Sequence, residues 1–188
     1  MKNKFELMEP LPTPMETFEV KRGLVKQVTA DGGLTALAND YFENVESPGD
    51  GSFEASFGIL SKVTGQYNEK GKLVVDVKQM KGSELSDYLS EDGGREKAME
   101  SRQRWSGFLD QATGYSAKQR GDKAKESAKK VSKAKSAISQ ARHFMEMADV
   151  DETLEKQAEE LIAEIEEALQ KGDNSRAASR GEKLGKLF

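Results

Sequence analysis

The sequence contains no cysteine and only one histidine among its 188 residues. Without cysteine there is no disulfide framework, no thiolate nucleophile and no cysteine-based zinc site. The single histidine, His143, would have to serve any Ser-His-Asp arrangement alone, and we expect it to be an ordinary helix residue. The absence of cysteine fits a reducing compartment, so we expect a cytoplasmic protein.

Long apolar runs and phosphate-binding glycine loops are also absent. No segment approaches the ~20 apolar residues of a membrane span, and residues 1–14 lack the apolar stretch of a signal peptide. Gly32-Gly33 and Gly93-Gly94 have neither the spacing nor the Lys-Ser/Thr pair of a nucleotide-binding fingerprint, so we interpret both as turns. We therefore expect a protein that is not an enzyme, holds no cofactor or metal and does not contact a membrane.

Two stretches of helical periodicity, separated by residues 149–151, are the clearest positive feature. Apolar residues recur in the first stretch at spacings of three and four: Val131, Ala134, Ile138, Ala141, Met145 and Ala148. A second row follows the turn: Leu154, Ala158, Leu161, Ile165, Ala168 and Gly172. Folded antiparallel, the rows set a large residue against a small one in most pairs. The pattern predicts an antiparallel coiled-coil hairpin; the competing interpretation is two unrelated amphipathic helices.

Upstream of the hairpin, the sequence combines strand and helix patterns. Alternation of apolar and polar residues predicts four strands, at residues 17–21, 52–57, 59–67 and 72–80. Helical spacing predicts helices at residues 34–42 and 95–112, the second ending at Gly114 in a left-handed cap. We expect a loop with at most one helical turn over residues 81–94. The fold class is α+β: a small antiparallel sheet of about four strands with two helices on one face, followed by the antiparallel coiled-coil helical hairpin.

Four segments follow from these patterns. Residues 1–14 contain Pro10, Pro12 and Pro14 and are expected to form an extended N-terminal arm. Residues 173–188 are expected to be a basic tail, either frayed or a short docking helix. The predicted organisation is an arm (1–14), an α+β module (15–115), a helical hairpin (116–172) and a basic C-terminal tail (173–188).

A short pattern closes the α+β module: Arg104-Trp105, Phe108-Leu109, Ala112-Thr113-Gly114-Tyr115-Ser116-Ala117-Lys118 and Arg120. It resembles a family of small archaeal proteins of unknown function, in which a strand-rich module ends in a tryptophan-bearing helix and a Thr-Gly-Tyr turn leading into basic residues. The resemblance covers residues 15–125, supports the fold and implies an archaeal origin. It carries over no catalytic residue. We expect Trp105 to be buried against the sheet, beside residues such as Leu73 and Val75.

The two helical stretches carry opposite charge, although the net charge of the chain is only −4. Residues 117–135 contain eight basic residues and two acidic ones, whereas residues 149–167 contain nine acidic residues and one lysine. The second helix is too short to cover the start of the first, which leaves four candidate phosphate contacts: Lys118, Arg120, Lys123 and Lys125. The alternative is a solvated helix face balanced by the acidic stretch, and no aromatic residue interleaves with these lysines.

Apolar residues just off the predicted seam are candidate partner contacts. Phe144 lies on one side of the hairpin, and Ile162 with Leu169 on the other. The alternative is that the module or the basic tail packs over them within the chain. We expect a non-enzymatic binding or adaptor protein of unknown partner, using a projecting helical hairpin, with a protein partner ahead of nucleic acid. The alternative function is an RNA- or DNA-associated protein that uses the basic segment 117–135.

Overall fold

The computed structural model describes residues 15–188 and divides the chain into two compact units, Met1–Arg120 and Gly121–Phe188. The extended arm predicted for residues 1–14 lies outside the described residues. The first unit contains a five-stranded antiparallel sheet with short helices and the helix α4, and the second contains long helices packed together. The predicted α+β fold class is confirmed.

The sheet has the strand order β1-β5-β4-β3-β2, and every neighbouring pair is antiparallel. Four of its strands correspond to the predicted ones: β1 (Glu16–Phe18), β3 (Ser52–Phe57), β4 (Leu60–Tyr67) and β5 (Leu73–Gln79). The hairpin between β4 and β5 pairs Tyr67 with Leu73 and Gly65 with Val75. Short connections between consecutive antiparallel strands account for the order from β2 to β5. β1 instead pairs with β5 at the edge opposite β2, and α1 and α2 lie in the connection between β1 and β2.

The fifth strand, β2 (Glu43–Gly49), was not predicted. It lies at the edge beside β3, and its register shifts twice along seven residues. Val45 alone is half-buried, while the other residues of the strand are exposed, so the apolar alternation that reveals a strand is missing. Pro48 is tolerated because an edge strand has one row of backbone groups without a ladder partner.

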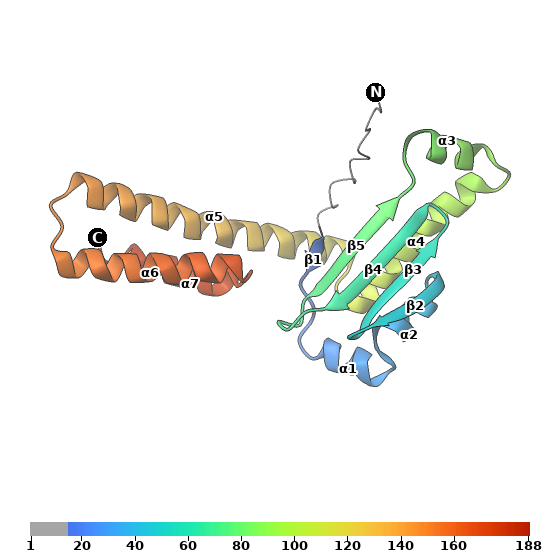
Figure 1. Ribbon diagram of the computed structural model, residues 1–188, viewed down its shortest axis with the longest axis horizontal. Coiled ribbons are helices and arrows are strands. Elements are labelled where there is room, and N and C mark those ends of the chain that lie inside the picture. The colour runs from blue at the N-terminus through green and yellow to red at the C-terminus, as the bar shows by residue number, and fades with distance from the viewer. Residues whose placement is uncertain (1–14) are drawn as a thin grey trace, which may run out of the picture. The chain divides into compact units, whose positions relative to one another are not determined.

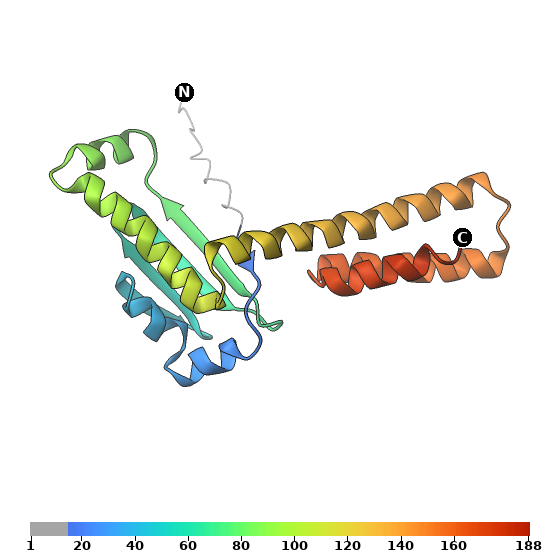
Figure 2. The same ribbon diagram turned by 180° about the vertical axis from the view of Figure 1, so that it is seen from behind.

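Helices cover one face of the sheet (Figures 1 and 2). The helices α2 (Gly33–Asn39) and α4 (Gly94–Thr113) supply the helical residues of the buried core. Beside them lie α1 (Leu24–Ala30) and α3 (Gly82–Ser90). From α2 and α4, Leu34, Phe108 and Leu109 meet the inward residues of the strands. Those inward residues alternate along the strands as the sequence predicts, and include Phe53, Ala55, Phe57, Val63, Leu73 and Val75. The other face is polar and carries an ion pair of 2.8 Å between Lys62 and Glu54.

Phe108 forms the centre of this core. Its side chain is fully buried, and its ring centroid lies 5.1 Å from that of Phe53 and 5.2 Å from that of Phe42. Trp105, which was expected to be buried beside Leu73 and Val75, is instead half-buried and packs against Phe108 and Phe42, at 5.9 and 6.3 Å between ring centroids. Trp105 and Phe108 lie one helical turn apart on the same face of α4, and Trp105 is partly buried against the cluster that contains Phe108.

The end of α4 has the predicted geometry. Gly114 adopts a left-handed backbone with φ 72°, and its N–H donates to the Asp110 carbonyl at 2.9 Å. A residue with a Cβ is disfavoured in this conformation, which is why glycine ends the helix here. Nearby, the Tyr67 hydroxyl donates to the Ala112 carbonyl at 2.7 Å, and burial raises the pKa of Tyr67 to about 12. The tyrosine therefore stays neutral and ties β4 to the last turn of α4.

The second unit contains α6 (Glu152–Gln170), α7 (Asn174–Leu184) and all but the first residues of α5 (Ala117–Met147). Of the two expectations for residues 173–188, the structure shows the docking helix, because Ala177 and Leu184 are fully buried. Side-chain caps start both shorter helices: Asp151 accepts from the backbone N–H groups of Thr153 and Leu154, and Asp173 accepts from that of Arg176. Figures 1 and 2 show α6 alongside α5, with α7 returning beside α6.

The helical core contains most of the predicted seam. Six predicted positions are buried: Ala134, Ile138, Ala141, Ala158, Ile165 and Ala168. One position is corrected, because Ile162 is 1% exposed whereas Leu161, which the heptad count selected, is half-buried. The reason is the third helix: α7 packs against α6 and widens its buried stripe beyond the two-helix seam. No helix among residues 15–188 is long and apolar enough to cross a membrane.

Candidate functional site

Arg120, a predicted phosphate contact, is engaged inside the first unit. It is 8% exposed, its guanidinium forms an ion pair with the Asp110 carboxylate, and it also donates to the Tyr115 carbonyl at 2.5 Å. These contacts join the end of α4 to the first turn of α5 across the Thr-Gly-Tyr turn. Because the guanidinium is nearly buried and paired with a carboxylate, Arg120 has a structural role and is not a candidate ligand contact.

The three lysines predicted together with Arg120 point outward to different degrees. Lys118 and Lys125 are exposed, and neither forms an ion pair within residues 15–188. Lys123 is half-buried and lies 3.7 Å from the Glu126 carboxylate, which Lys130 approaches to 3.0 Å. Glu126 is therefore taken up by two lysines, and their hydrogen bonds and charges, led by the hydrogen bond from Lys130, lower the pKa of its carboxyl.

The predicted apolar contacts are placed differently from one another. Ile162 and Leu169 were candidate partner contacts, but Ile162 is in the helical core and Leu169 is half-buried against it, so the structure shows the alternative of packing within the chain on that flank. Phe144 is 43% exposed, and its ring lies 4.7 Å from that of Phe188, which is 38% exposed. Met147, one helical turn after Phe144, is 77% exposed. These three residues, Phe144, Met147 and Phe188, form an apolar end patch.

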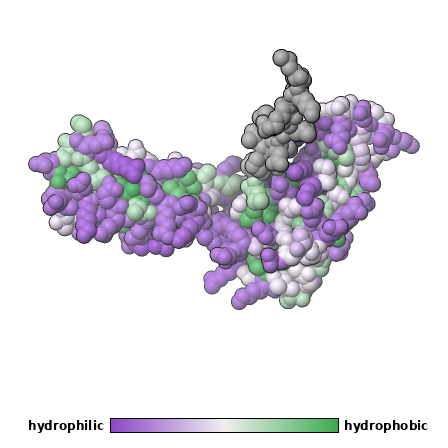
Figure 3. Space-filling view, viewed as in Figure 1, coloured by the Kyte–Doolittle hydropathy of each residue, from purple (hydrophilic) through white to green (hydrophobic). Residues whose placement is uncertain are grey.

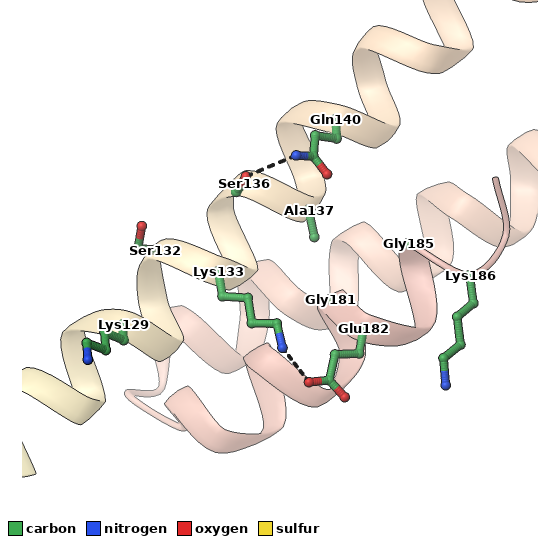
Figure 4. Close-up of a pocket in the computed structure, with 10 residues that line it drawn as sticks. All are labelled: Lys129, Ser132, Lys133, Ser136, Ala137, Gln140, Gly181, Glu182, Gly185 and Lys186. Carbon is green, nitrogen blue, oxygen red and sulfur yellow. Dashed lines mark hydrogen bonds and ion pairs between the residues drawn. The ribbon is translucent and has the colours of Figure 1, made fainter.

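A polar groove with a volume of about 680 Å³ lies between α5 and α7, within the second unit (Figure 4). Its α5 side carries amines, hydroxyls and an amide, and its α7 side carries small residues and one charge of each sign. The lining residues are Lys129, Ser132, Lys133, Ser136, Ala137, Gln140, Gly181, Glu182, Gly185 and Lys186. No aromatic side chain lines it, so the groove offers hydrogen-bond donors and positive charge rather than a stacking surface.

An ion pair crosses the groove. The Lys133 ammonium lies 2.6 Å from the Glu182 carboxylate, as Figure 4 shows. The hydrogen bond from Lys133 and its positive charge lower the pKa of Glu182, so the acid stays ionised and occupied. Lys129 and Lys186 form no ion pair with any residue of the described chain. Of the three amines that line the groove, two therefore remain for a ligand.

Close packing at Gly181 sets the width of the groove. A Cβ at this position would lie 3.3 Å from the Ala137 Cβ and 3.4 Å from the Ala134 Cα, so α7 approaches α5 more closely than a larger residue would allow. Gly185, one turn later, faces open space apart from carbonyls of its own helix. The two glycines thus provide a matched pair, one packed and one not.

We expect Gly181→Val to loosen α7 from α5, because the valine must displace Ala137 or the α5 backbone. The loss of stability should exceed that of Gly185→Val by about 1–3 kcal/mol, the usual cost of forcing extra volume into a packed contact. Thermal unfolding and hydrogen exchange of the α7 amides measure the difference. Equal losses in the two variants would show that the close approach does not hold α7 in place.

The contribution of α7 to this groove is not predicted from the sequence. The basic character of residues 117–135 is predicted, but residues 173–188 are expected to form a separate tail. A local signal was present: Asp173 is an N-cap residue, and Ala177, Gly181 and Leu184 recur at helical spacing. Residue spacing does not indicate on which side of α5 this helix docks.

Metal-ligating side chains are not clustered in the part of the chain that the structure describes. His143 is exposed on α5, and among residues 15–188 no group of three or more histidine, aspartate or glutamate residues is placed to hold a metal ion. The polar groove and the apolar end patch both lie in the second unit. Figure 3 shows the helical unit as largely hydrophilic with separate hydrophobic areas.

The fold defines an α+β domain followed by a unit of packed helices. The chain belongs to the DUF5611 family: the model of this domain of unknown function matches residues 15–126, more than half of the chain. The match covers nearly the same residues as the resemblance described above, and it ends within α5 at Glu126. The groove and the end patch therefore lie beyond the family domain. No curated protein and no solved structure matches the chain.

Proposed function

We propose that this protein is a non-enzymatic binding or adaptor protein whose helical unit engages a protein partner. The observation that carries the proposal is the apolar end patch. The exposed rings of Phe144 and Phe188 lie against each other, and Met147 is exposed one helical turn further along α5, while the core of the same unit is filled by other residues. Single exposed apolar residues are common on protein surfaces, but contiguous ones mark interaction sites.

The chemistry of the patch fits a protein partner. The paired rings of Phe144 and Phe188 present a rigid apolar surface, and aromatic residues are enriched where binding energy concentrates in interfaces. Met147 adds a flexible side chain that adapts to irregular pockets. Acidic residues of α6 surround the turn, including Glu152 and Glu155 in its first turn, and would form a polar rim. A cytoplasmic location, and the archaeal origin that the resemblance implies, remain predictions of this proposal.

The proposal is tested by capturing the partner from native lysate with the wild type and with two double variants, each of which replaces two exposed apolar residues. We expect Phe144→Ser/Met147→Ser to reduce capture of the partner by at least about tenfold, the effect of removing a hot spot of 1.4 kcal/mol or more. The control is Met15→Ser/Met99→Ser, since both methionines are exposed in the first unit, at 68% and 61%. Equal capture by both double variants and the wild type would refute the end patch as the binding surface.

A second candidate function is contact with RNA or DNA through the basic segment 117–135. It is favoured by the exposure of Lys118 and Lys125, which form no ion pair within residues 15–188. Nuclease treatment of the lysate separates the two functions, because a partner held through nucleic acid is lost after digestion and a directly bound protein is not.

A further inference from the structure

We propose that the groove between α5 and α7 binds the phosphate groups of a polyanionic chain, with a nucleic-acid backbone as the expected source. This inference deepens the second candidate function by naming its site, and it does not depend on the apolar end patch. The sequence predicts phosphate contacts at the start of the basic segment, at Lys118, Arg120, Lys123 and Lys125. The groove instead lies toward the other end of that segment, and α7 forms one of its sides.

The first argument is the spacing of amines along α5. Lys125, Lys129 and Lys133 follow one another at four-residue intervals, which places each about 6 Å further along the helix and on nearly the same side. Lys133 is held by Glu182, so Lys125 and Lys129 are the members of this row left for a chain of spaced negative charges, and Lys125 lies one helical turn before the lining residues. Lys186 lines the groove from α7, so positive charge borders it on both sides.

The second argument is the balance of charge on the two helices. Residues 121–140 carry six lysines and two acidic residues, and residues 174–188 carry four basic residues and one acidic residue. Glu126 is taken up by Lys130 and Lys123, and Glu182 by Lys133. Asp122 is the remaining acid of these two segments, and Arg176 and Arg180 of α7 lie near Glu164 of α6. Lys125, Lys129 and Lys186 form no ion pair within residues 15–188, so they supply the positive charge that faces a ligand.

The third argument is the polar lining. Ser132, Ser136 and Gln140 place two hydroxyls and an amide along the groove, and Gln140 donates to the Ser136 hydroxyl at 3.4 Å. Hydroxyls and amides are frequent partners of phosphate oxygens beside lysine. Gly185 on the α7 side is exposed and adds no side chain that would block a ligand backbone. The lack of aromatic lining predicts contact without base stacking or sequence preference.

The test measures binding of a fluorescent single-stranded RNA to the full chain over a salt series. We expect Lys129→Glu/Lys186→Glu to weaken binding at least tenfold and to lower the salt slope by about 1.4, at about 0.7 per lost contact on a single strand. Neither substitution breaks the Lys133–Glu182 pair. Lys129→Arg/Lys186→Arg should bind as the wild type does. The matched control is Lys26→Glu/Lys156→Glu, which changes the net charge equally at two exposed lysines outside the groove.

Competitors identify the source of the phosphate. If DNA of the same sequence competes as well as RNA does, and inorganic polyphosphate competes poorly, the ligand is a nucleic-acid backbone. If polyphosphate competes equally well, the groove binds phosphate chains in general. Competition by poly-glutamate at the same charge concentration would overturn the proposal, since it would show a surface for any polyanion. Circular dichroism and α7 hydrogen exchange confirm that each variant is folded.

Two further outcomes separate this inference from the function on which it rests. If the wild type shows no saturable binding at low salt, both the groove and the second candidate function are refuted, and the protein-binding proposal stands alone. If the wild type binds and the groove variant binds equally well, only the groove is refuted. A loss confined to Lys118→Glu/Lys125→Glu would then place the contact at the start of α5.

Discussion

Replacing Ile165 with aspartate is expected to unfold the helical unit while the sheet of the first unit stays folded. Ile165 is completely buried between α5, α6 and α7, so the substitution removes a large apolar side chain and puts an unpaired carboxylate in its place. Losing the side chain alone costs about 2–5 kcal/mol, and burying the charge adds several more. That total is comparable to the whole stability of a small domain.

The two units should respond separately because their cores share no residue. One core is built from residues between Leu34 and Ala112, the other from residues between Ala134 and Leu184. Hydrogen exchange of the full chain distinguishes them: amides of α6 and α7 should lose protection, whereas those of β3 and β4 should keep it. Ala163→Asp is the control, since it adds the same charge to an exposed position of the same helix. Unchanged α6 protection in the Ile165 variant would mean that the helical core is wrongly assigned.

Phe108→Ala is expected to destabilise the first unit by about 3–5 kcal/mol, the usual cost of removing a buried phenylalanine from a core. Phe108 is fully buried and lies at the meeting point of α2, α4 and the sheet. Its ring contacts four other rings, and an alanine would leave their facing surfaces without partner atoms: Tyr41, Phe42, Phe53 and Trp105.

Chemical denaturation followed by fluorescence measures this loss directly. Trp105 is the only tryptophan of the chain and belongs to the first unit, so its emission reports on that unit alone. Met99→Ala provides the control on the same helix, because Met99 is 61% exposed and its removal should change stability by less than about 0.5 kcal/mol. If the two variants unfolded at the same denaturant concentration, Phe108 would not be the centre of the core.

The boundary of the family domain bears on both proposed surfaces. DUF5611 ends at Glu126, after the Arg120–Asp110 pair but before the first residue that lines the groove, Lys129. The part of α5 that belongs to the family is thus the part that closes the α+β module. Partner binding through the groove or the end patch would be a property of the helices beyond the matched family domain.

Several features of the fold were predictable because they depend on local pattern. Strict alternation in Phe53, Ala55 and Phe57 predicts a strand with one buried face, and Gly114 predicts a helix end. Both are found, as is the buried row that includes Ile138 and Ile165. β2 was not predicted, because an exposed edge strand with a proline has neither alternating apolar and polar residues nor a strong strand propensity.

The site was less predictable than the fold. Arg120 and Lys118 look alike in sequence, two basic residues at the start of one helix. Only the folded chain shows that Arg120 is paired with Asp110 and buried, while Lys118 is exposed. Likewise, Leu161 and Ile162 are adjacent apolar residues, and the docking of α7 decides that Ile162 is the more buried.

By itself, the sequence determined the α+β class, four of the five strands, the helices around the turn at residues 149–151 and the opposite charges of those helices. These features follow from periodicity and composition, which act between near neighbours in the chain. The tertiary structure alone decided which basic residues are occupied, which apolar residues α7 covers, and where α5 and α7 enclose a groove. Those depend on contacts such as Gly181 with Ala137 and Lys133 with Glu182, which join residues more than forty positions apart and leave no local pattern to read.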